Sequence, residues 1–530
     1  MILSAFKFRP NFIGQIDAET DEKTTYQQML ENSVKCALWL KRQILGKNIT
    51  ISISTSQQML SYIPLLAGLY VGAIINPWDP KYFEDDVRVM YFLVEYKPEV
   101  IFVDRNDYLI LMRAINRLNL TCDTIAVPKI VTFGKVEGHE EISLESILSG
   151  NFEQDKINEF YCKDMNPIDI VVNMFCTTAT SYPGKTYIRY FSFVFPSNQE
   201  VPEMSPDGIG LWYGPLSWTY HLLLTIRSIV SYVTVIKCSK FYDENMYNAI
   251  EKYKVKWVFL QSAMCSQLFK TDIRMYDVSS LKQLIFGDSA INHVIYEQLI
   301  KHFTNASIVQ VYSLSKVGII AAYQRNSKSI GSSGHVAKNV NLMILNEERT
   351  KANLSSDTLG EIWFKLTCKW CNTKTCKLPN CIQRKKNKNK NITLSSAAIT
   401  STWHCTEDYG FYKKTGEIFI IDKIKNLIKY KLYCIPPTII ENVLQNHPAV
   451  LEVVVKSVPH REYGEIPMAY IRLKYEYQVT KDELIKYVQR NVTDVFKHGD
   501  LCFTKEMPYL PNGKIDRSLV GYIKKESYKY

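Results

Sequence analysis

The order of apolar and polar positions predicts helices that alternate with short strands along most of the chain. From Tyr26, the spacing of Leu30, Val34 and Leu38 places apolar groups on one face of a helix, and residues 48–54 then alternate isoleucine with polar residues, as a strand does. Short apolar runs typical of buried strands recur at 98–104, 256–261, 283–288 and 307–314. Strands that alternate with helices predict an α/β protein with layers of helices on largely parallel sheets.

The end of the chain is predicted to form a smaller α+β unit of its own. A capping-box pattern at 480–483 and a Pro-Pro pair at 436–437 each open a helix with an apolar face. With 530 residues the chain is also too long for one core. We therefore predict two domains, 1–421 and 422–530, divided where a hairpin strand at 417–421 ends.

Composition excludes few classes of protein. With 46% apolar and 22% charged residues, the chain resembles an ordinary soluble enzyme. The net charge of +11 comes partly from one lysine-rich run at 384–390, so charge alone does not imply a nucleic-acid partner. The apolar segment 63–75 is too short to cross a membrane and contains Pro64, Gly68 and Gly72, which favours a buried helix. Thirteen cysteines without an evident secretory signal are typical of reduced thiols and a cytoplasmic location.

The segment 403–441 carries acids and lysines at fixed places around one predicted hairpin. Asp408 lies in its first strand and Asp422 near the end of the second, and Lys425, Lys429 and Lys431 are predicted to follow on an alternating strand. Taken alone, these lysines would be a solvated strand face, and the downstream Pro-Asn-Gly-Lys at 511–514 would be a turn.

The order of these motifs, however, resembles that of the adenylate-forming superfamily of acyl-CoA synthetases, coumarate-CoA ligases and beetle luciferases. The resemblance covers nearly the whole chain and implies a large nucleotide-binding domain at 1–421 and a small mobile lid domain at 422–530. It also implies ATP, magnesium and CoA as cofactors and a small carboxylic acid as substrate.

The resemblance assigns roles to individual residues. Asp408 matches the acid that binds the ribose hydroxyls, although the usual glycine before it is Glu407, and Asp422 matches the hinge. Lys423 replaces an arginine that also reaches the ribose. Lys514 matches the lysine that bridges the carboxylate and the α-phosphate.

A second group of implied contacts surrounds the phosphates. Thr177, Thr180, Ser181 and Lys185 lie in the counterpart of a glycine-rich phosphate loop whose internal glycines are absent here, so a hydroxyl-rich surface turn is the alternative. Within the motif Tyr312-Ser313-Leu314-Ser315-Lys316, the resemblance implies that Tyr312 packs on adenine and that Ser315 touches phosphate. Lys316 replaces the acid that binds magnesium in relatives, and an ammonium cannot coordinate the ion.

Further positions are implied to line the adenine, acyl and CoA pockets: Phe286, Gly287, Asp288, Trp218, Tyr220 and Lys431. Trp218 and Tyr220 are bulky and would shorten or close the acyl pocket, or they are plain core residues. Between residues 367 and 402 the chain has an insertion that the family does not explain. Its cysteines have the spacing of a zinc knuckle, with reduced thiols in a lysine-rich loop as the alternative: Cys368, Cys371, Cys376 and Cys381.

Two functional hypotheses follow, with a luciferase-type oxygenase as a weaker third. In the first, ATP adenylates a carboxylic acid and CoA then displaces AMP, with reduced or altered activity. In the second, the chain is a pseudoenzyme that binds a nucleotide, an acyl ligand or a protein partner without turnover. The end of the chain, 527–530, lacks the Ser-Lys-Leu-like peroxisomal signal of many relatives. The sequence does not specify the acid, the acceptor or the oligomeric state.

Overall fold

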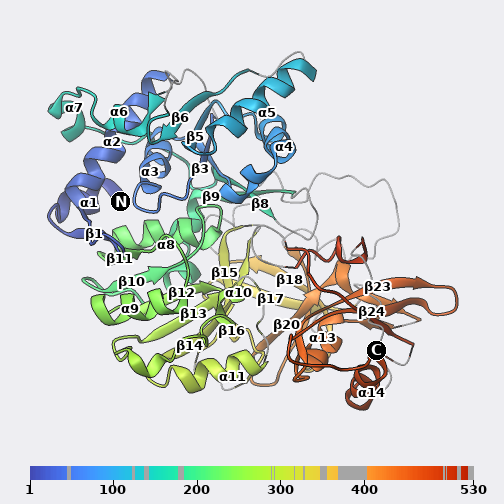
Figure 1. The fold of residues 1–530 in the computed structure, drawn as a ribbon. Helices are drawn as coiled ribbons and strands as arrows, with labels where there is room; N and C mark the ends of the chain where they lie inside the picture. The colour runs from blue at the N-terminus through green and yellow to red at the C-terminus, as the bar shows by residue number, and fades with distance from the viewer. Residues whose placement is uncertain are drawn as a thin grey trace, which may run out of the picture.

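A computed structural model describes most of the chain. The described residues are 1–43, 49–121, 126–136, 142–176, 184–287, 289, 291, 293–315, 317–325, 329–346, 355–367, 403–431, 433–492, 496, 498–509 and 515–522. The model confirms the predicted α/β class, with a large N-terminal part and a smaller C-terminal part (Figure 1). Within the described ranges, no helix combines the length and apolar character needed to span a bilayer.

The first sheet is mostly parallel and lies between two layers of helices. Its described strands, in spatial order, are β7 (Ile142–Ser143), β6 (Lys129–Phe133), β5 (Val100–Asp104), β3 (Thr50–Ser54), β4 (Ile74–Pro77), β8 (Ile170–Cys176) and β9 (Gly184–Arg189). One face packs on α2 (Tyr26–Gln43), α3 (Tyr62–Val71) and α6 (Leu144–Leu148). The other packs on α4 (Asp86–Tyr96) and α5 (Tyr108–Thr121). Short helices α1 (Ile2–Phe8) and α7 (Gln154–Asn158) lie toward the outside (Figure 1).

The second sheet also has a parallel centre, but both of its edges are antiparallel, whereas the first sheet has one antiparallel edge, between β8 and β9. Its described strands are β16 (His335–Val336), β15 (Ile319–Tyr323), β14 (Ser307–Leu314), β13 (Gln283–Gly287), β12 (Trp257–Gln261), β10 (Ile209–Trp212), β11 (Thr234–Lys237), β1 (Ile13–Asp17) and β2 (Lys23–Thr25). Its helices are α8 (Thr219–Val230) on the side of the first sheet and α9 (Asp243–Tyr253), α10 (Ser262–Cys265) and α11 (His293–His302) on the other. The carboxyl ends of its parallel strands open toward the C-terminal part, where polar loops can gather.

Two further sheets contain the remaining described strands, and these sheets are antiparallel apart from one parallel pair in the second. One contains β17 (Val340–Leu345), β18 (Gly360–Leu366), β19 (His404–Tyr412) and β20 (Ile418–Lys423). The other contains β22 (Tyr433–Ile435), β21 (Ile428–Tyr430), β24 (Gly464–Leu473), β23 (Val450–His460) and β25 (Asp500–Phe503), covered by α13 (Pro437–Gln445) and α14 (Lys481–Asn491). Figure 1 shows these elements in colours from yellow through orange to red.

Several local predictions are confirmed. The four apolar runs form β5, β12, β13 and β14, and Thr480 with Glu483 forms a complete capping box at α14. The predicted buried helix at 63–75 is α3, which ends at Val71 because Gly72 adopts a left-handed conformation.

Two local predictions are wrong. The hairpin strand predicted to end at 421 continues to Lys423, because its backbone remains paired with β19. The alternating strand predicted for Lys425, Lys429 and Lys431 is interrupted: a 3₁₀ turn spans Ile424–Asn426, and of these lysines only Lys429 lies in β21. Lys431 sits in a turn with φ of 52°.

A candidate nucleotide site between two sheets

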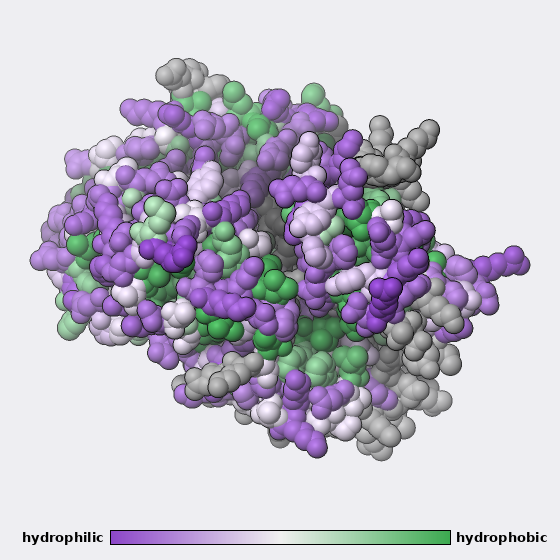
Figure 2. Space-filling view, turned by 60° about the horizontal axis from the view of Figure 1, so that its bottom comes forward, coloured by the Kyte–Doolittle hydropathy of each residue, from purple (hydrophilic) through white to green (hydrophobic). Residues whose placement is uncertain are grey.

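A cavity of about 1410 Å³ lies where the large part meets the C-terminal part. Figure 2 shows the surface hollowed near the middle of the face that it presents. The loops after several parallel strands contribute to its wall, as does the hairpin of β19 and β20. From the far side it is lined by the C-terminal part, through Glu441, Asn442, Val453, Val454, Ile515 and Arg517.

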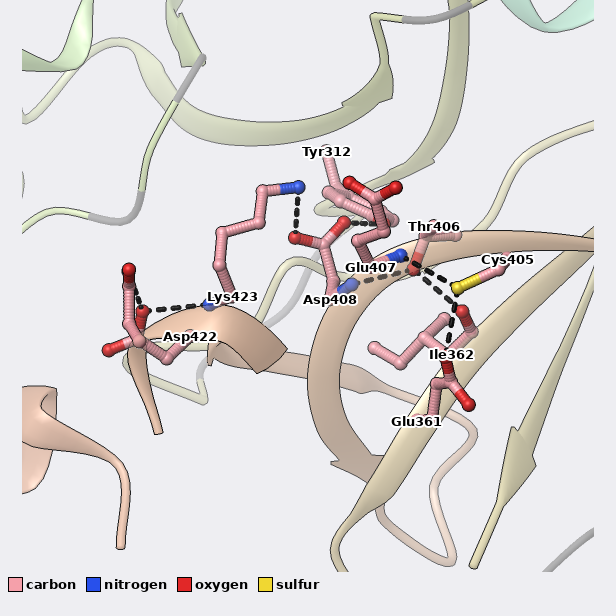
Figure 3. A network of polar contacts seen from close by, with 10 residues as sticks. Tyr312, Glu361, Ile362, Cys405, Thr406, Glu407, Asp408, Asp422 and Lys423 are labelled. Atoms are coloured by element: carbon pink, nitrogen blue, oxygen red, sulfur yellow. Dashed lines mark hydrogen bonds and ion pairs between the residues drawn. The ribbon is translucent and has the colours of Figure 1, made fainter. Parts of the chain in front are cut away.

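Asp408 lies in the wall of this cavity and is held from two sides. Its Oδ2 accepts a hydrogen bond of 2.6 Å from the Tyr312 hydroxyl, and its Oδ1 lies 2.6 Å from the Lys423 ammonium (Figure 3). Only 6% of Asp408 is exposed. A buried carboxylate with a cation and a hydroxyl as partners is a fixed acceptor of hydrogen bonds.

Tyr312 comes from β14 and is therefore positioned by a different sheet from Asp408. Burial, together with the Asp408 carboxylate, raises the pKa of Tyr312 well above its ordinary value of 10. The hydroxyl thus remains protonated and donates to Asp408 across the physiological range. Ser313, Leu314 and Ser315 continue along the cavity wall.

Asp422 lies next to Lys423 on β20 and also lines the cavity. Its Oδ1 accepts hydrogen bonds from the Lys423 amide at 2.7 Å and from Asn426 Nδ2 at 2.8 Å. Its Oδ2 is buried and makes no hydrogen bond within the part of the chain that the structure describes. One carboxylate oxygen at the predicted hinge is therefore buried without a hydrogen-bond donor among the described residues.

Trp218 and Tyr220 are both core residues and cavity residues. They are 9% and 3% exposed and pack edge-to-face on each other, and both contact the ring of Phe259. Both also line the cavity. The two alternatives from the sequence are thus compatible, since an aromatic cluster fills one end of the cavity.

The predicted adenine and acyl loop is divided between core and cavity. Phe286 is fully buried against Tyr296 and is not among the residues that line the cavity. A β-carbon at Gly287 would come within 2.5 Å of Val311, so glycine permits the close approach of β13 and β14 there. Ser289 and Ile291, just beyond, do line the cavity.

Two predicted site lysines are directed elsewhere. Lys185 lies 2.9 Å from the Glu95 carboxylate and donates to the Glu95 carbonyl oxygen at 2.7 Å, at the end of α4. Lys431 lies over the ring of Tyr463 on the C-terminal part, and neither lysine lines the cavity.

Other predicted residues lie outside the described ranges. These are Thr177, Thr180, Ser181, Asp288, Lys316, Lys514 and the cysteines Cys368, Cys371, Cys376 and Cys381. Ile515, which follows Lys514, is described and lines the cavity.

Sequence reasoning missed several cavity residues. Thr55 and Ser56 follow β3, and both donate hydrogen bonds to Asp104 at the end of β5. Asp79 follows β4 and lines the cavity nearby. Polar residues directly after parallel strands were a signal that could have identified them. Cys405 and Arg517 carried no such signal.

Comparison with known proteins decides the family. The model of the AMP-binding enzyme family matches residues 5–368, and that of the AMP-binding enzyme C-terminal domain matches residues 439–514. This chain belongs to the AMP-binding enzyme family. The family includes ligases that form AMP from ATP, as the resemblance of the motifs had implied.

Named relatives and a solved structure agree with this assignment. The chain is 23% identical to 4-coumarate-CoA ligase-like 9 of Arabidopsis thaliana, over 95% of this chain and 85% of the relative. It is also 23% identical to luciferin 4-monooxygenase of Photinus pyralis, over 97% and 91%. The fold matches ATP-bound MatB from Rhodopseudomonas palustris with a TM-score of 0.79 at 14% identity, covering 98% and 97% of the two chains.

Proposed function

We propose that this protein activates a small carboxylic acid with ATP and then transfers the acyl group to the thiol of CoA. One observation carries this proposal: the cavity that contains Asp408 is also lined by Ile515 and Arg517. Lys514, the expected catalytic lysine, directly precedes Ile515 in the sequence, and Ile515 lines the same cavity as the carboxylate expected to hold the ribose.

The described residues fit a nucleotide. A ribose offers two neighbouring hydroxyl donors, and a carboxylate oxygen can accept more than one hydrogen bond. Asp408 can therefore bind the ribose while keeping its contacts with Tyr312 and Lys423.

The reaction would proceed in two balanced steps. A carboxylate oxygen of the acid attacks the α-phosphorus of ATP, and pyrophosphate leaves. The thiol of CoA then loses its proton to solvent and its sulfur attacks the acyl carbon, and AMP leaves with the electrons of the broken C–O bond. Because carboxylate and phosphate repel each other, cations must face them, and Lys81, Lys240 and Lys423 line the cavity.

The described residues offer no cluster of side chains that could bind magnesium. Among the described residues, no group of three or more His, Cys, Asp or Glu side chains could hold a metal ion. We therefore assign no protein ligand to magnesium and derive no step through it.

Exchange of labelled pyrophosphate into ATP tests the proposal, since it requires only the first step. With a panel of short aliphatic, fatty and aromatic acids, at least one acid should support exchange, and Lys514→Ala should abolish it. The assay does not need rotation of the lid. A lack of pyrophosphate exchange therefore cannot be attributed to a failure of the thioester step.

Nucleotide binding without turnover is the second candidate function. It is favoured by Lys316 in place of an acid and by the existing ion pair of Asp408 with Lys423. If no acid of the panel supports pyrophosphate exchange and the same folded protein binds AMP measurably, the second function is supported over the first.

A further inference from the structure

The turn that precedes Asp408 has a backbone conformation that residues with a β-carbon rarely adopt. Glu407, within β19, has φ of 65°. Outside glycine, asparagine and aspartate, such left-handed residues are uncommon and persist only where neighbouring contacts hold them. The pairing of β19 with β18 also shifts register between Glu361 and Trp363, opposite this turn.

Two side chains next to Glu407 bond the backbone of the turn. The Cys405 thiol donates to Glu361 Oε1 at 2.9 Å, and its sulfur accepts the amide of Glu407 at 3.2 Å (Figure 3). The Thr406 hydroxyl donates to the carbonyl oxygen of Ile362 at 2.6 Å and accepts the amide of Asp408 at 3.0 Å.

The number of protons on each side chain determines which atom donates in each hydrogen bond. A thiol or a hydroxyl has one proton, so Cys405 gives its proton to Glu361 and has only lone pairs left for the Glu407 amide. Glu361 is only 5% exposed, and its carboxylate accepts the thiol hydrogen bond within the protein interior. The chain of bonds therefore runs from a buried acid on β18 through the sulfur to the left-handed residue.

We propose that Cys405, oriented by Glu361, is a positioning residue that maintains the left-handed turn at Glu407 and thereby points Asp408 into the cavity. Side chains alternate between the two faces of a strand, so a turn that relaxed to regular strand would shift Asp408 toward the opposite face. The consequence for ligand binding rests on the proposed function, because it takes Asp408 as the nucleotide-binding acid.

A double-variant cycle in the full-length protein tests this role. Cys405→Ala removes both bonds of the sulfur, Cys405→Ser keeps a donor and an acceptor, and Glu407→Gly removes the need for support because glycine adopts positive φ freely. Melting temperature is measured for every variant, and AMP affinity by calorimetry.

We expect Cys405→Ala to lower the melting temperature and to weaken AMP binding roughly tenfold, as for loss of one hydrogen bond. Cys405→Ser should bind AMP within about twofold of the wild type, since both bonds are retained. In the Glu407→Gly background, Cys405→Ala should lower the melting temperature and AMP affinity less than it does alone, because only the loss of the contact with Glu361 remains. If Cys405→Ala alone does not fold, recovery of folded protein in the double variant supports the role.

Equal losses from Cys405→Ala in both backgrounds would overturn the proposal, as would a Cys405→Ala protein identical to the wild type. The melting temperatures test the role of Cys405 even if the protein does not bind AMP. Absence of AMP binding by the wild type, with the thermal coupling intact, would instead refute the nucleotide site and leave the role of Cys405 standing.

Discussion

Lys423 and Asp408 face each other across an antiparallel strand pair, with Lys423 Nζ 2.6 Å from Asp408 Oδ1. The side chain of Asp408 is 9% exposed and that of Lys423 is 40% exposed. The carboxylate is therefore fixed in the wall, whereas the ammonium extends toward the cavity. This asymmetry suits a lysine that both neutralises the acid and contacts a bound anion.

Replacement of Lys423 by methionine should weaken AMP binding roughly tenfold or more, because a charge-assisted contact is lost and Asp408 loses its cation. Lys423→Arg should bind AMP within about threefold of the wild type, since the charge is kept. Calorimetric titration with AMP provides the measurement. Lys414→Met, an exposed lysine at the turn of the same hairpin, is the matched control. Wild-type affinity in Lys423→Met would remove Lys423 from the site.

The Tyr312 hydroxyl can be removed without changing the ring. Tyr312→Phe leaves one oxygen of Asp408 without its 2.6 Å donor, so AMP affinity should fall by roughly three- to tenfold. Because the pKa of Tyr312 is raised well above 10 by burial and by Asp408, wild-type affinity should show no tyrosine titration up to pH 10. Tyr475→Phe, at a fully exposed tyrosine, is the control. A titration near pH 9 that disappears in Tyr312→Phe would contradict this assignment.

Arg517, which follows Lys514 closely in the sequence, is bound to α13 and β23 of the C-terminal part. Its guanidinium binds both oxygens of Glu441, at 2.5 and 2.8 Å, and donates to the carbonyl oxygen of Val455 at 2.6 Å. Arg517→Lys keeps the charge but loses the planar fork. We expect the rate of pyrophosphate exchange to fall at least tenfold while AMP affinity changes little, because Lys514 is expected to act on the reacting atoms and not on the ribose.

Arg490→Lys, on the exposed face of α14, provides the control for that comparison. If Arg517→Lys weakened AMP binding as much as it slowed exchange, Arg517 would belong to the nucleotide site itself.

Lys237 should make stability depend on pH. It is 6% exposed on β11, 4.6 Å from the ring centre of Trp212, and burial lowers its pKa from 10.5 to about 7. Between these pH values the unfolded chain binds a proton that the folded protein lacks, so stability rises with pH, by at most about 1.4 kcal/mol per unit. Lys237→Met should therefore melt higher than the wild type at pH 7.

The advantage of Lys237→Met should shrink as the pH rises toward 10. Melting temperatures measured from pH 7 to pH 10 test this slope, with Lys301→Met on the exposed side of α11 as control. Parallel curves for Lys237→Met and the wild type would show that Lys237 is charged in the folded protein throughout.

The strands of the large part that were predicted are short apolar runs, and the run pattern reflects burial on both faces, as β12 and β13 show. The end of β20 was not predictable, because a strand ends where its backbone loses its hydrogen-bonded partner. No side-chain pattern in the sequence indicates that Asp408 pairs with Lys423. The interruption at Ile424–Asn426 was missed for the same reason.

The candidate site was likewise predictable only in part. Tyr312, Asp408 and Lys423 were singled out by the order of motifs, but the contact of Tyr312 with Asp408 joins residues 96 positions apart and needs the fold. Cys405 was not singled out, because its role depends on a backbone angle at Glu407 that the sequence does not reveal. The positions of Lys185 and Lys431 likewise depend on Glu95 and Tyr463, their neighbours in space.

The most direct test of the nucleotide site is AMP binding by Asp408→Asn. This variant keeps the size of the side chain but replaces an acceptor of two ribose hydroxyls by an amide, and it leaves Lys423 without its counter-ion. We predict that the wild type binds AMP and that Asp408→Asn binds it roughly a hundredfold more weakly, while Asp482→Asn on the exposed face of α14 binds as the wild type does. Equal affinity of Asp408→Asn and the wild type would contradict the account.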